Sequence, residues 1–227
     1  MMFILNMTVD GCYIKSSDDC FCMYNSCDSI LWLGNEDYDN PYAVCENVEV
    51  KNCIMASNAR PFVLGGHATG NKVSRCVINN IYIHDCEIIH TPNRIFGNTE
   101  EHAMRWSGLM RILSQSEHLV KNIIFENMTF DVTSGHNGKA VHIEVRDGGS
   151  ASYTEAGGYR IENVRFNNIK IKGNTQDMVK SLVKCGVDSG ELYGVYNVVF
   201  ENFQIGDKYI KNDDVIKIGN VKGVKYD

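Results

Sequence analysis

Two adjacent carboxylates near the start of the chain are the residues best suited to chemistry, in the stretch Ser16-Ser17-Asp18-Asp19-Cys20. Neighbouring carboxyl groups can divide the work of glycoside hydrolysis, one as the general acid and the other as the base that activates water. An inverting enzyme keeps these groups roughly 6.5–9.5 Å apart to make room for the water. Serine and aspartate are also frequent in turns, so a turn without catalytic function is the competing interpretation. The similar doublet in Asn212-Asp213-Asp214, near the C-terminus, illustrates this risk.

The elements that must position this doublet follow from a repeat in the sequence. Its unit begins with Asn, has apolar residues at positions two, four, seven and nine, and has Asn, Asp or Gly at position six. The starts are separated by 41, 33, 42, 41, 34 and 23 residues, which predicts stacked turns of chain joined by loops of different length. The copies begin at Asn6, Asn47, Asn80, Asn122, Asn163 and Asn197, with a partial copy at Asn220.

The phase of the apolar residues within the unit predicts two short strands separated by a corner. Alternation with period two is typical of a strand, and the skip at position six marks the corner. Gly, Asn and Asp tolerate the left-handed backbone that such a corner requires. In stacked copies each corner Asn can bond the next one, and Cys12, Cys53 and Cys86 can stack inside.

A third apolar segment follows each copy and predicts a third strand. In the fourth copy Val141, Ile143 and Val145 can face the interior, which leaves His142 and Glu144 on a polar outer face suited to binding a glycan. The segments cover residues 20–23, 61–64, 109–113, 141–145, 182–185 and 215–218.

These patterns predict an all-β fold, a right-handed parallel β-helix of about seven coils with three short strands each. We expect a single domain over residues 1–227 that lacks upstream coils. A leucine-rich or propeller array is the alternative, but neither helix-period segments nor a Trp-Asp blade signature supports it.

The stretch from Met7 to Cys20 resembles the region around the paired aspartates of polygalacturonases and of the related dextranase and isopullulanase β-helices, which share the pectin-lyase-like fold. The resemblance implies that Asp18 is the general acid and Asp19 a base that activates water. Gly65-Gly66-His67-Ala68 is similar to the family's Gly-His-Gly motif, which implies that His67 helps to keep Asp18 protonated. Gly108-Leu109-Met110-Arg111-Ile112-Leu113 is similar to its Arg-Ile-Lys motif, so Arg111 would bind a sugar carboxylate or hydroxyls.

The chain also departs from this family. A further family aspartate, in an Asn-Thr-Asp motif one coil earlier, would fall before residue 1. Leu113 replaces the family's Lys, which weakens the case for galacturonate and leaves a neutral or differently charged glycan open. Each of these residues also has a non-functional interpretation. His67 would then be an ordinary loop histidine, and Arg111 a strand arginine that binds no ligand. His142 and Glu144 would belong to a solvated face.

Composition limits the partners. The net charge is −6 and the sequence has no basic patch, which argues against nucleic acid as a partner. No apolar stretch is close to the length of a membrane-spanning helix, about 20 residues. We find no signal peptide, so we expect a cytoplasmic protein if the chain is complete and a secreted or periplasmic one if an N-terminal part is missing. Nine cysteines without zinc-type pairs favour reduced core packing over disulfides. We expect neither metal nor cofactor.

Two classes of function remain open from the sequence. The first is an inverting glycoside hydrolase that acts on a polysaccharide or oligosaccharide. The second, prompted by the missing upstream aspartate, is a non-catalytic glycan-binding or structural fragment of a larger carbohydrate-active enzyme. A polysaccharide lyase is a third idea with less support. The unpaired strand edges of a terminal coil would allow a homo-oligomer.

Overall fold

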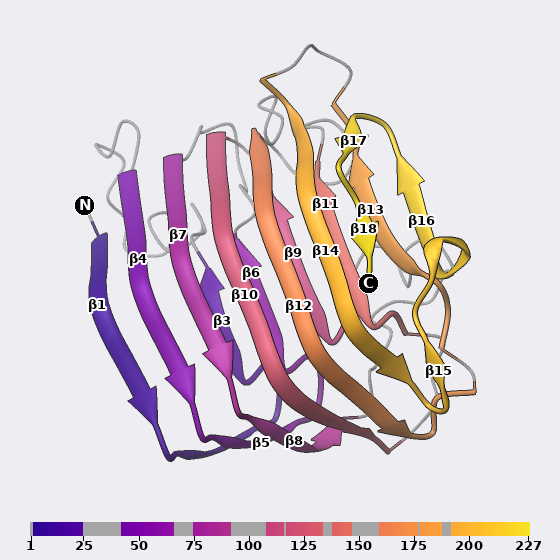
Figure 1. The fold of residues 1–227 in the computed structure, drawn as a ribbon. Helices are drawn as coiled ribbons and strands as arrows, with labels where there is room; N and C mark the ends of the chain where they lie inside the picture. The colour runs from indigo at the N-terminus through magenta and orange to yellow at the C-terminus, as the bar shows by residue number, and fades with distance from the viewer. Residues whose placement is uncertain are drawn as a thin grey trace.

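The chain folds into parallel β-sheets whose strands follow the order of the sequence repeats (Figure 1). This computed structural model describes residues 2–24, 42–65, 75–91, 108–115, 117–133, 138–146, 159–176, 178–187 and 192–227. Among the described strands, every pairing is parallel except the one between β14 and β15. The structure is therefore all-β, and segments about 33–44 residues apart lie side by side, as the spacing of the repeat predicts.

The larger sheet contains the strand that opens each repeat, and Figure 1 shows these strands in order across the front. They are β1 (Met2–Asp10), β4 (Tyr42–Lys51), β7 (Arg75–His84), β10 (Glu117–Val132), β12 (Arg160–Gly173) and β14 (Gly194–Ile205). Beyond the corner, β2 (Tyr13–Ser16), β5 (Ile54–Ser57) and β8 (Glu87–Thr91) pair with one another in the first three repeats. In β10 and β12 the strand continues through the corner, so the two strands predicted there are one bent strand.

The smaller sheet contains the predicted third segments and lies behind the larger one in Figure 1. Its strands are β3 (Phe21–Tyr24), β6 (Phe62–Gly65), β9 (Met110–Ser114), β11 (Val141–Val145), β13 (Ser181–Cys185) and β16 (Val215–Ile218). At the C-terminal end, β15 (Lys208–Tyr209), β17 (Val221–Lys222) and β18 (Lys225–Tyr226) pair with β14, and a short 3-10 helix (Asn212–Asp214) precedes β16. No helix in the described part of the chain is long and apolar enough to cross a membrane.

The corner at position six is confirmed. Its residues have φ values between 47° and 64°, in the left-handed region that Asn, Asp and Gly tolerate best. They are Gly11, Asn52, Asp85, Asn127, Asn168 and Asn202. The Asn that opens each repeat is also left-handed, with φ between 55° and 57° at Asn6, Asn47, Asn80, Asn122, Asn163 and Asn197. Each repeat thus bends twice, five residues apart, and the first bend was not expected.

The corner side chains bond from one repeat to the next, as predicted. Asn202 Nδ2 donates to Asn168 Oδ1 at 2.9 Å, and Asn168 Nδ2 donates to Asn127 Oδ1 at 2.8 Å. Asn163 Nδ2 likewise donates to Asn122 Oδ1 at 2.9 Å, at the first bend. These ladders hold neighbouring repeats in register.

We expect Asn168→Ala to lower the free energy of unfolding by about 2–3 kcal/mol, because alanine loses the ladder bonds and is strained at positive φ. Asn168→Gly removes the same bonds without the strain and should cost about 1 kcal/mol. Urea unfolding of both variants measures the difference, with the exposed Lys170→Ala on the same strand as the control. Equal losses for alanine and glycine would contradict a strained corner at this position.

The core lies between the two sheets and stacks equivalent side chains. Ile123, Phe125, Met128 and Phe130 of β10 are at most 1% exposed, which confirms the predicted inward positions. Phe125, Phe166, Phe200 and Tyr226 form a column, with successive ring centroids 5.4, 5.2 and 5.5 Å apart. Burying each of the three phenylalanine rings contributes about 1.5–3 kcal/mol, whereas Tyr226 is only partly buried.

The cysteine prediction is confirmed in part. Cys53 and Cys86 are buried and, like every cysteine within the described ranges, form no disulfide. Cys12 is exposed, contrary to the prediction, because among the described strands β1 and β2 pair on one side only, with β4 and β5. A first repeat without a neighbour on that side cannot bury its inward residues completely.

Candidate functional site

The aspartate doublet lies in the turn between β2 and β3, at the start of the smaller sheet. The Asp18 backbone N–H donates to Ser16 Oγ at 3.1 Å, and its carbonyl accepts a bond from Ser57 Oγ at 2.9 Å. Both of these hydrogen bonds are made by backbone atoms of Asp18, and its side chain is exposed. The turn interpretation is therefore correct as local structure, and the turn presents one carboxylate to solvent.

Asp19 is held by Arg60, which occupies the equivalent position before the third strand of the next repeat. Arg60 Nε donates to Asp19 Oδ1 at 2.7 Å and Nη2 donates to Oδ2 at 2.6 Å. The Arg60 backbone N–H also donates to Oδ1, at 3.1 Å. Sequence reasoning missed Arg60, although its position two residues before Phe62 matches that of Asp19 before Phe21. Both carboxylate oxygens of Asp19 already accept bonds, so this group is fixed in place.

Arg111 lies two strands from β3 on the face of the smaller sheet that points away from the core. It pairs in register with Val63 of β6 and His142 of β11, and it is 1% exposed. Burial lowers the pKa of Arg111 well below its ordinary value, and Arg146 and Arg60 add to this by repulsion. The negative charge of Asp19 partly opposes this lowering of the Arg111 pKa. The stacking therefore brings the doublet and the predicted arginine close enough to interact electrostatically.

Glu144 is the acidic centre of the next strand, β11. Its Oε2 lies 3.3 Å from His142 Nε2 and 2.8 Å from Arg146 Nε, and its Oε1 lies 3.2 Å from Lys184 Nζ of β13. Burial alone would raise the pKa of Glu144, but His142 and Arg146 hold it well below its usual range. Glu144 therefore stays ionised and compensates several cations.

The prediction that His142 and Glu144 lie on an open polar face is wrong in one respect. Both side chains point away from the core, yet His142, Glu144 and the neighbouring Arg146 are only 0%, 4% and 5% exposed. Alternation along a strand determines which way a side chain points, but it carries no information on whether that face is covered. The ion pairs around Glu144 allow charged groups to remain on this buried face.

Lys139, just before β11, belongs to the same neighbourhood and was also missed. It is 1% exposed, and burial lowers its pKa to about 8, with Glu144 opposing this effect and Arg111 adding to it. Together these residues are called the charged cluster of the smaller sheet. Its described members are Asp19, Arg60, Arg111, Lys139, His142, Glu144, Arg146 and Lys184. This set combines several cations with two carboxylates, a chemistry that suits sugar hydroxyls or an acidic sugar.

The predicted partner His67 lies outside the described residues. Of the six predicted site residues, Asp19, Arg111, His142 and Glu144 thus meet in the charged cluster, while Asp18 lies next to it in sequence on the exposed turn.

The buried His142 should make stability depend on pH. Burial lowers the pKa of His142 to about 4, although the Glu144 carboxylate opposes this. An unfolded histidine titrates near 6.5, so the unfolded chain takes up the proton first as the pH falls. The histidine's contribution is complete above about pH 6.5, and we expect it to decline by up to about 3 kcal/mol as the pH falls to 4.

Urea unfolding at several pH values between 7.5 and 4 measures this effect. His142→Asn should flatten the curve over that interval, whereas His90→Asn, at a partly exposed position on β8, should keep the wild-type slope. Parallel curves for the wild type and His142→Asn would show that the buried imidazole is not responsible.

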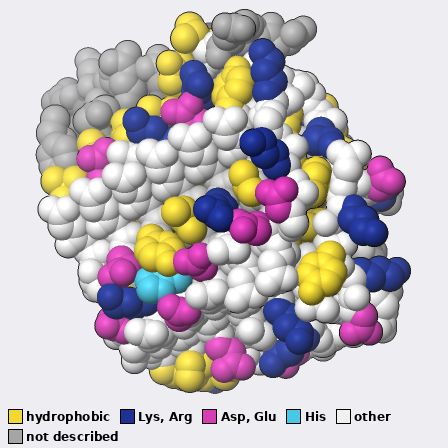
Figure 2. Space-filling model, in the orientation of Figure 1, with side chains coloured by type: hydrophobic (Ala, Val, Ile, Leu, Met, Phe, Trp, Pro, Cys, Tyr) yellow, Lys and Arg dark blue, Asp and Glu magenta, His cyan; other side chains and the backbone are white. Residues whose placement is uncertain are grey.

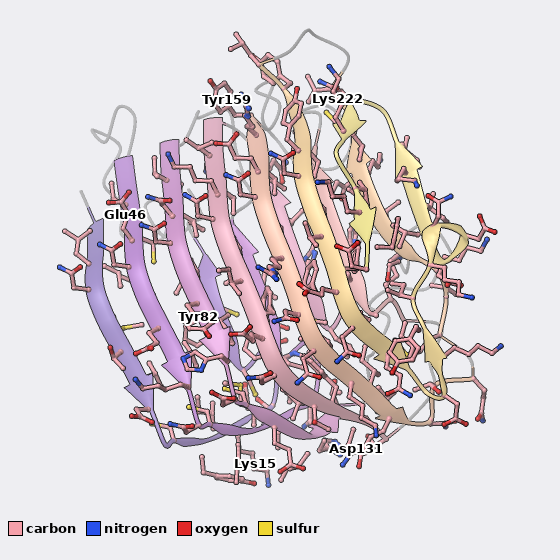
Figure 3. All side chains as sticks on the ribbon, viewed as in Figure 1. Lys15, Glu46, Tyr82, Asp131, Tyr159 and Lys222 are labelled. Carbon is pink, nitrogen blue, oxygen red and sulfur yellow. The ribbon has the colours of Figure 1, made fainter. Side chains whose placement is uncertain are left out.

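A second polar network covers the outer face of the larger sheet, where Figure 2 shows acidic and basic side chains interspersed. The Tyr82 hydroxyl, labelled on β7 in Figure 3, donates to Glu126 of β10, and this bond raises the pKa of Tyr82 to about 12. His84 stacks on Tyr82 with ring centroids 4.0 Å apart, and its Nδ1 lies 2.6 Å from Asp85 Oδ2. In the described part of the chain no group of His, Cys, Asp or Glu could hold a metal ion. Of these contacts, the Tyr82–Glu126 bond ties β7 to β10 and stabilises the sheet.

Comparison with known proteins adds no relative. No protein-family model, curated protein or solved structure matches the chain. The function must therefore be argued from the geometry of the site.

Proposed function

We propose that the chain is a right-handed parallel β-helix that acts as an inverting glycoside hydrolase of the polygalacturonase-like type on a polysaccharide. The in-order parallel pairing of the repeats and their left-handed corners support the fold. The observation that carries the function is the convergence of Asp19, Arg60 and Arg111 on one face, next to the exposed Asp18.

In this mechanism the Asp18 carboxyl donates a proton to the glycosidic oxygen as the bond to the leaving sugar breaks. Water attacks the opposite face of the sugar ring and loses its proton to a carboxylate, the role that the resemblance gives to Asp19. Arg60 fixes the orientation of Asp19, and His67 would help to keep Asp18 protonated. No step requires a metal or a cofactor.

The roles proposed for Arg111, His142 and Glu144 concern substrate binding. Their side chains can hold sugar hydroxyls or a carboxylate through charge-assisted bonds. All three are at most 4% exposed, so the exposed Asp18 is the predicted site residue that a polymer can contact directly. The contacts around Glu144 hold His142 and Arg146 in place beside it.

A non-catalytic glycan-binding module is the second candidate, and one observation favours it. Arg60 occupies both oxygens of Asp19, which leaves this carboxylate poorly placed to accept a proton from water. In that case the doublet would hold the turn and orient a bound sugar without cleaving it.

A panel of polygalacturonate, dextran and pullulan tests the proposal. Release of reducing ends from any of them would support hydrolysis, and binding without release would support the second candidate. Unsaturated products would instead indicate a lyase, with the buried Lys139 as the residue to examine as its base. Neither binding nor cleavage of any polymer would contradict both candidates.

A further inference from the structure

A hollow of about 400 Å³ lies near the C-terminal end, apart from the aspartate doublet. One wall is formed by residues 175–176 and 178–180 between β12 and β13, together with Ser181 at the start of β13. The other is formed by residues 205–209 of the β14–β15 hairpin and by Ile210 and Asp214 after it. Small-molecule sites commonly fall between about 300 and 1,000 Å³. The hollow is therefore large enough to hold part of a ligand.

The hollow combines an apolar lining with an exposed aromatic ring. Ile210 is buried, and Met178 and Ile205 pack against the core. Tyr209 is 56% exposed, although its backbone is fixed by pairing with Gln204 and by the neighbouring bond from Ile210 N–H to the Phe203 carbonyl at 2.8 Å. A rigidly held and exposed tyrosine offers a flat apolar face with a polar tip.

The charged residues of the hollow balance one another. Lys180 and Lys208 carry positive charge, and Asp207 and Asp214 carry negative charge. This balance favours a neutral ligand with many hydrogen-bonding groups over a strongly anionic or cationic one. A sugar ring meets both requirements, because its hydroxyls point outward around the rim and its C–H groups form an apolar face.

The hollow lies next to the strand that carries part of the charged cluster. Val179 forms a bridge with Lys139, and the Ser181 hydroxyl accepts a bond from the Val141 N–H at 3.3 Å. The hollow thus lies at the start of β13, and the doublet lies at the start of β3, four strands away in the same sheet. At the spacing of neighbouring strands this is ~19 Å, so a polymer could contact both places but a single sugar could not.

We propose that this hollow is a second glycan subsite, in which Tyr209 stacks against one sugar ring of a neutral polysaccharide. The inference takes its ligand class from the proposed function, but it concerns a different site. It does not require Asp18 to be catalytic.

Electrophoresis through gels that contain dextran, pullulan or polygalacturonate tests the subsite by retardation. We expect a neutral polymer to retard the wild type, Tyr209→Ala to bind about tenfold more weakly and Tyr209→Phe to bind nearly as well as the wild type. Tyr13→Ala, which removes another exposed tyrosine at the far end of the molecule, is the matched control and should bind normally. Unfolding midpoints confirm that each variant is folded.

Equal retardation of the wild type and Tyr209→Ala would overturn the subsite, and so would retardation by polygalacturonate alone or by no polymer. Failure of the proposed function has a different signature, in which Tyr209-dependent binding persists and no reducing ends are released.

Discussion

Replacing Asp18 with asparagine should lower the release of reducing ends by about 10²–10⁴-fold, the usual contribution of a general acid. Asparagine has nearly the same shape but cannot supply the proton that the leaving oxygen requires. Because the described hydrogen bonds of Asp18 come from its backbone, the fold should persist. Initial rates on the polymer that the wild type cleaves best, together with the unfolding midpoint, measure both effects.

Asp213→Asn is the matched control for this prediction. Asp213 is another exposed aspartate of a doublet before a strand of the smaller sheet, but it lies at the opposite end of the stack, before β16. Its substitution should leave the rate unchanged. Full activity of Asp18→Asn would eliminate Asp18 as the acid, and an equal loss in both variants would indicate a nonspecific effect of removing charge.

Replacing Glu144 with glutamine should have the largest effect on stability, a loss of about 3–5 kcal/mol from the free energy of unfolding. The Glu144 side chain is 6% exposed and contacts Arg146 and Lys184. A neutral amide removes the negative charge that Glu144 provides next to these cations and near Arg111. The whole stability of a domain is typically about 5–15 kcal/mol, so such a loss is easily measured by urea unfolding.

Two further variants show whether this loss arises from an uncompensated buried charge. Adding Arg146→Met to Glu144→Gln should restore part of the stability, because it removes one of the cations. Glu201→Gln breaks the exposed pair with Arg165 and should cost at most about 1 kcal/mol. A comparable cost for Glu201→Gln and Glu144→Gln would contradict the assigned burial of the charged cluster.

The repeat made much of the fold predictable. Asn, Asp or Gly at position six predicted the corners at Asn52 and Asn127, because few other residues tolerate a positive φ. Alternation predicted the inward side chains, such as Ile123 and Phe125. The continuation of β10 through its corner was not predictable, because parallel neighbours that bend at the same residue can keep pairing on both sides of the bend.

The site was less predictable than the fold. Stacking does bring Asp19 and Arg111 into one cluster, as the spacing suggested. Arg60 and Lys139 were overlooked because they precede the third strands, where the repeat has no fixed residue type. The burial of His142 and Glu144 was not predictable, because alternation along a strand determines the direction of a side chain but not how far it is buried.

A double-mutant cycle between Asp19 and Arg60 tests most directly whether stacked repeats build the site, since these residues are 41 positions apart in sequence. The free energies of unfolding of Asp19→Asn, Arg60→Met and the double variant, compared with the wild type, give the coupling. We predict a coupling of about 2 kcal/mol for this bidentate pair, and none between Asp19 and the distant Arg165. Losses for Asp19 and Arg60 that add to within about 0.5 kcal/mol would contradict the stacking that unites the doublet with the arginines.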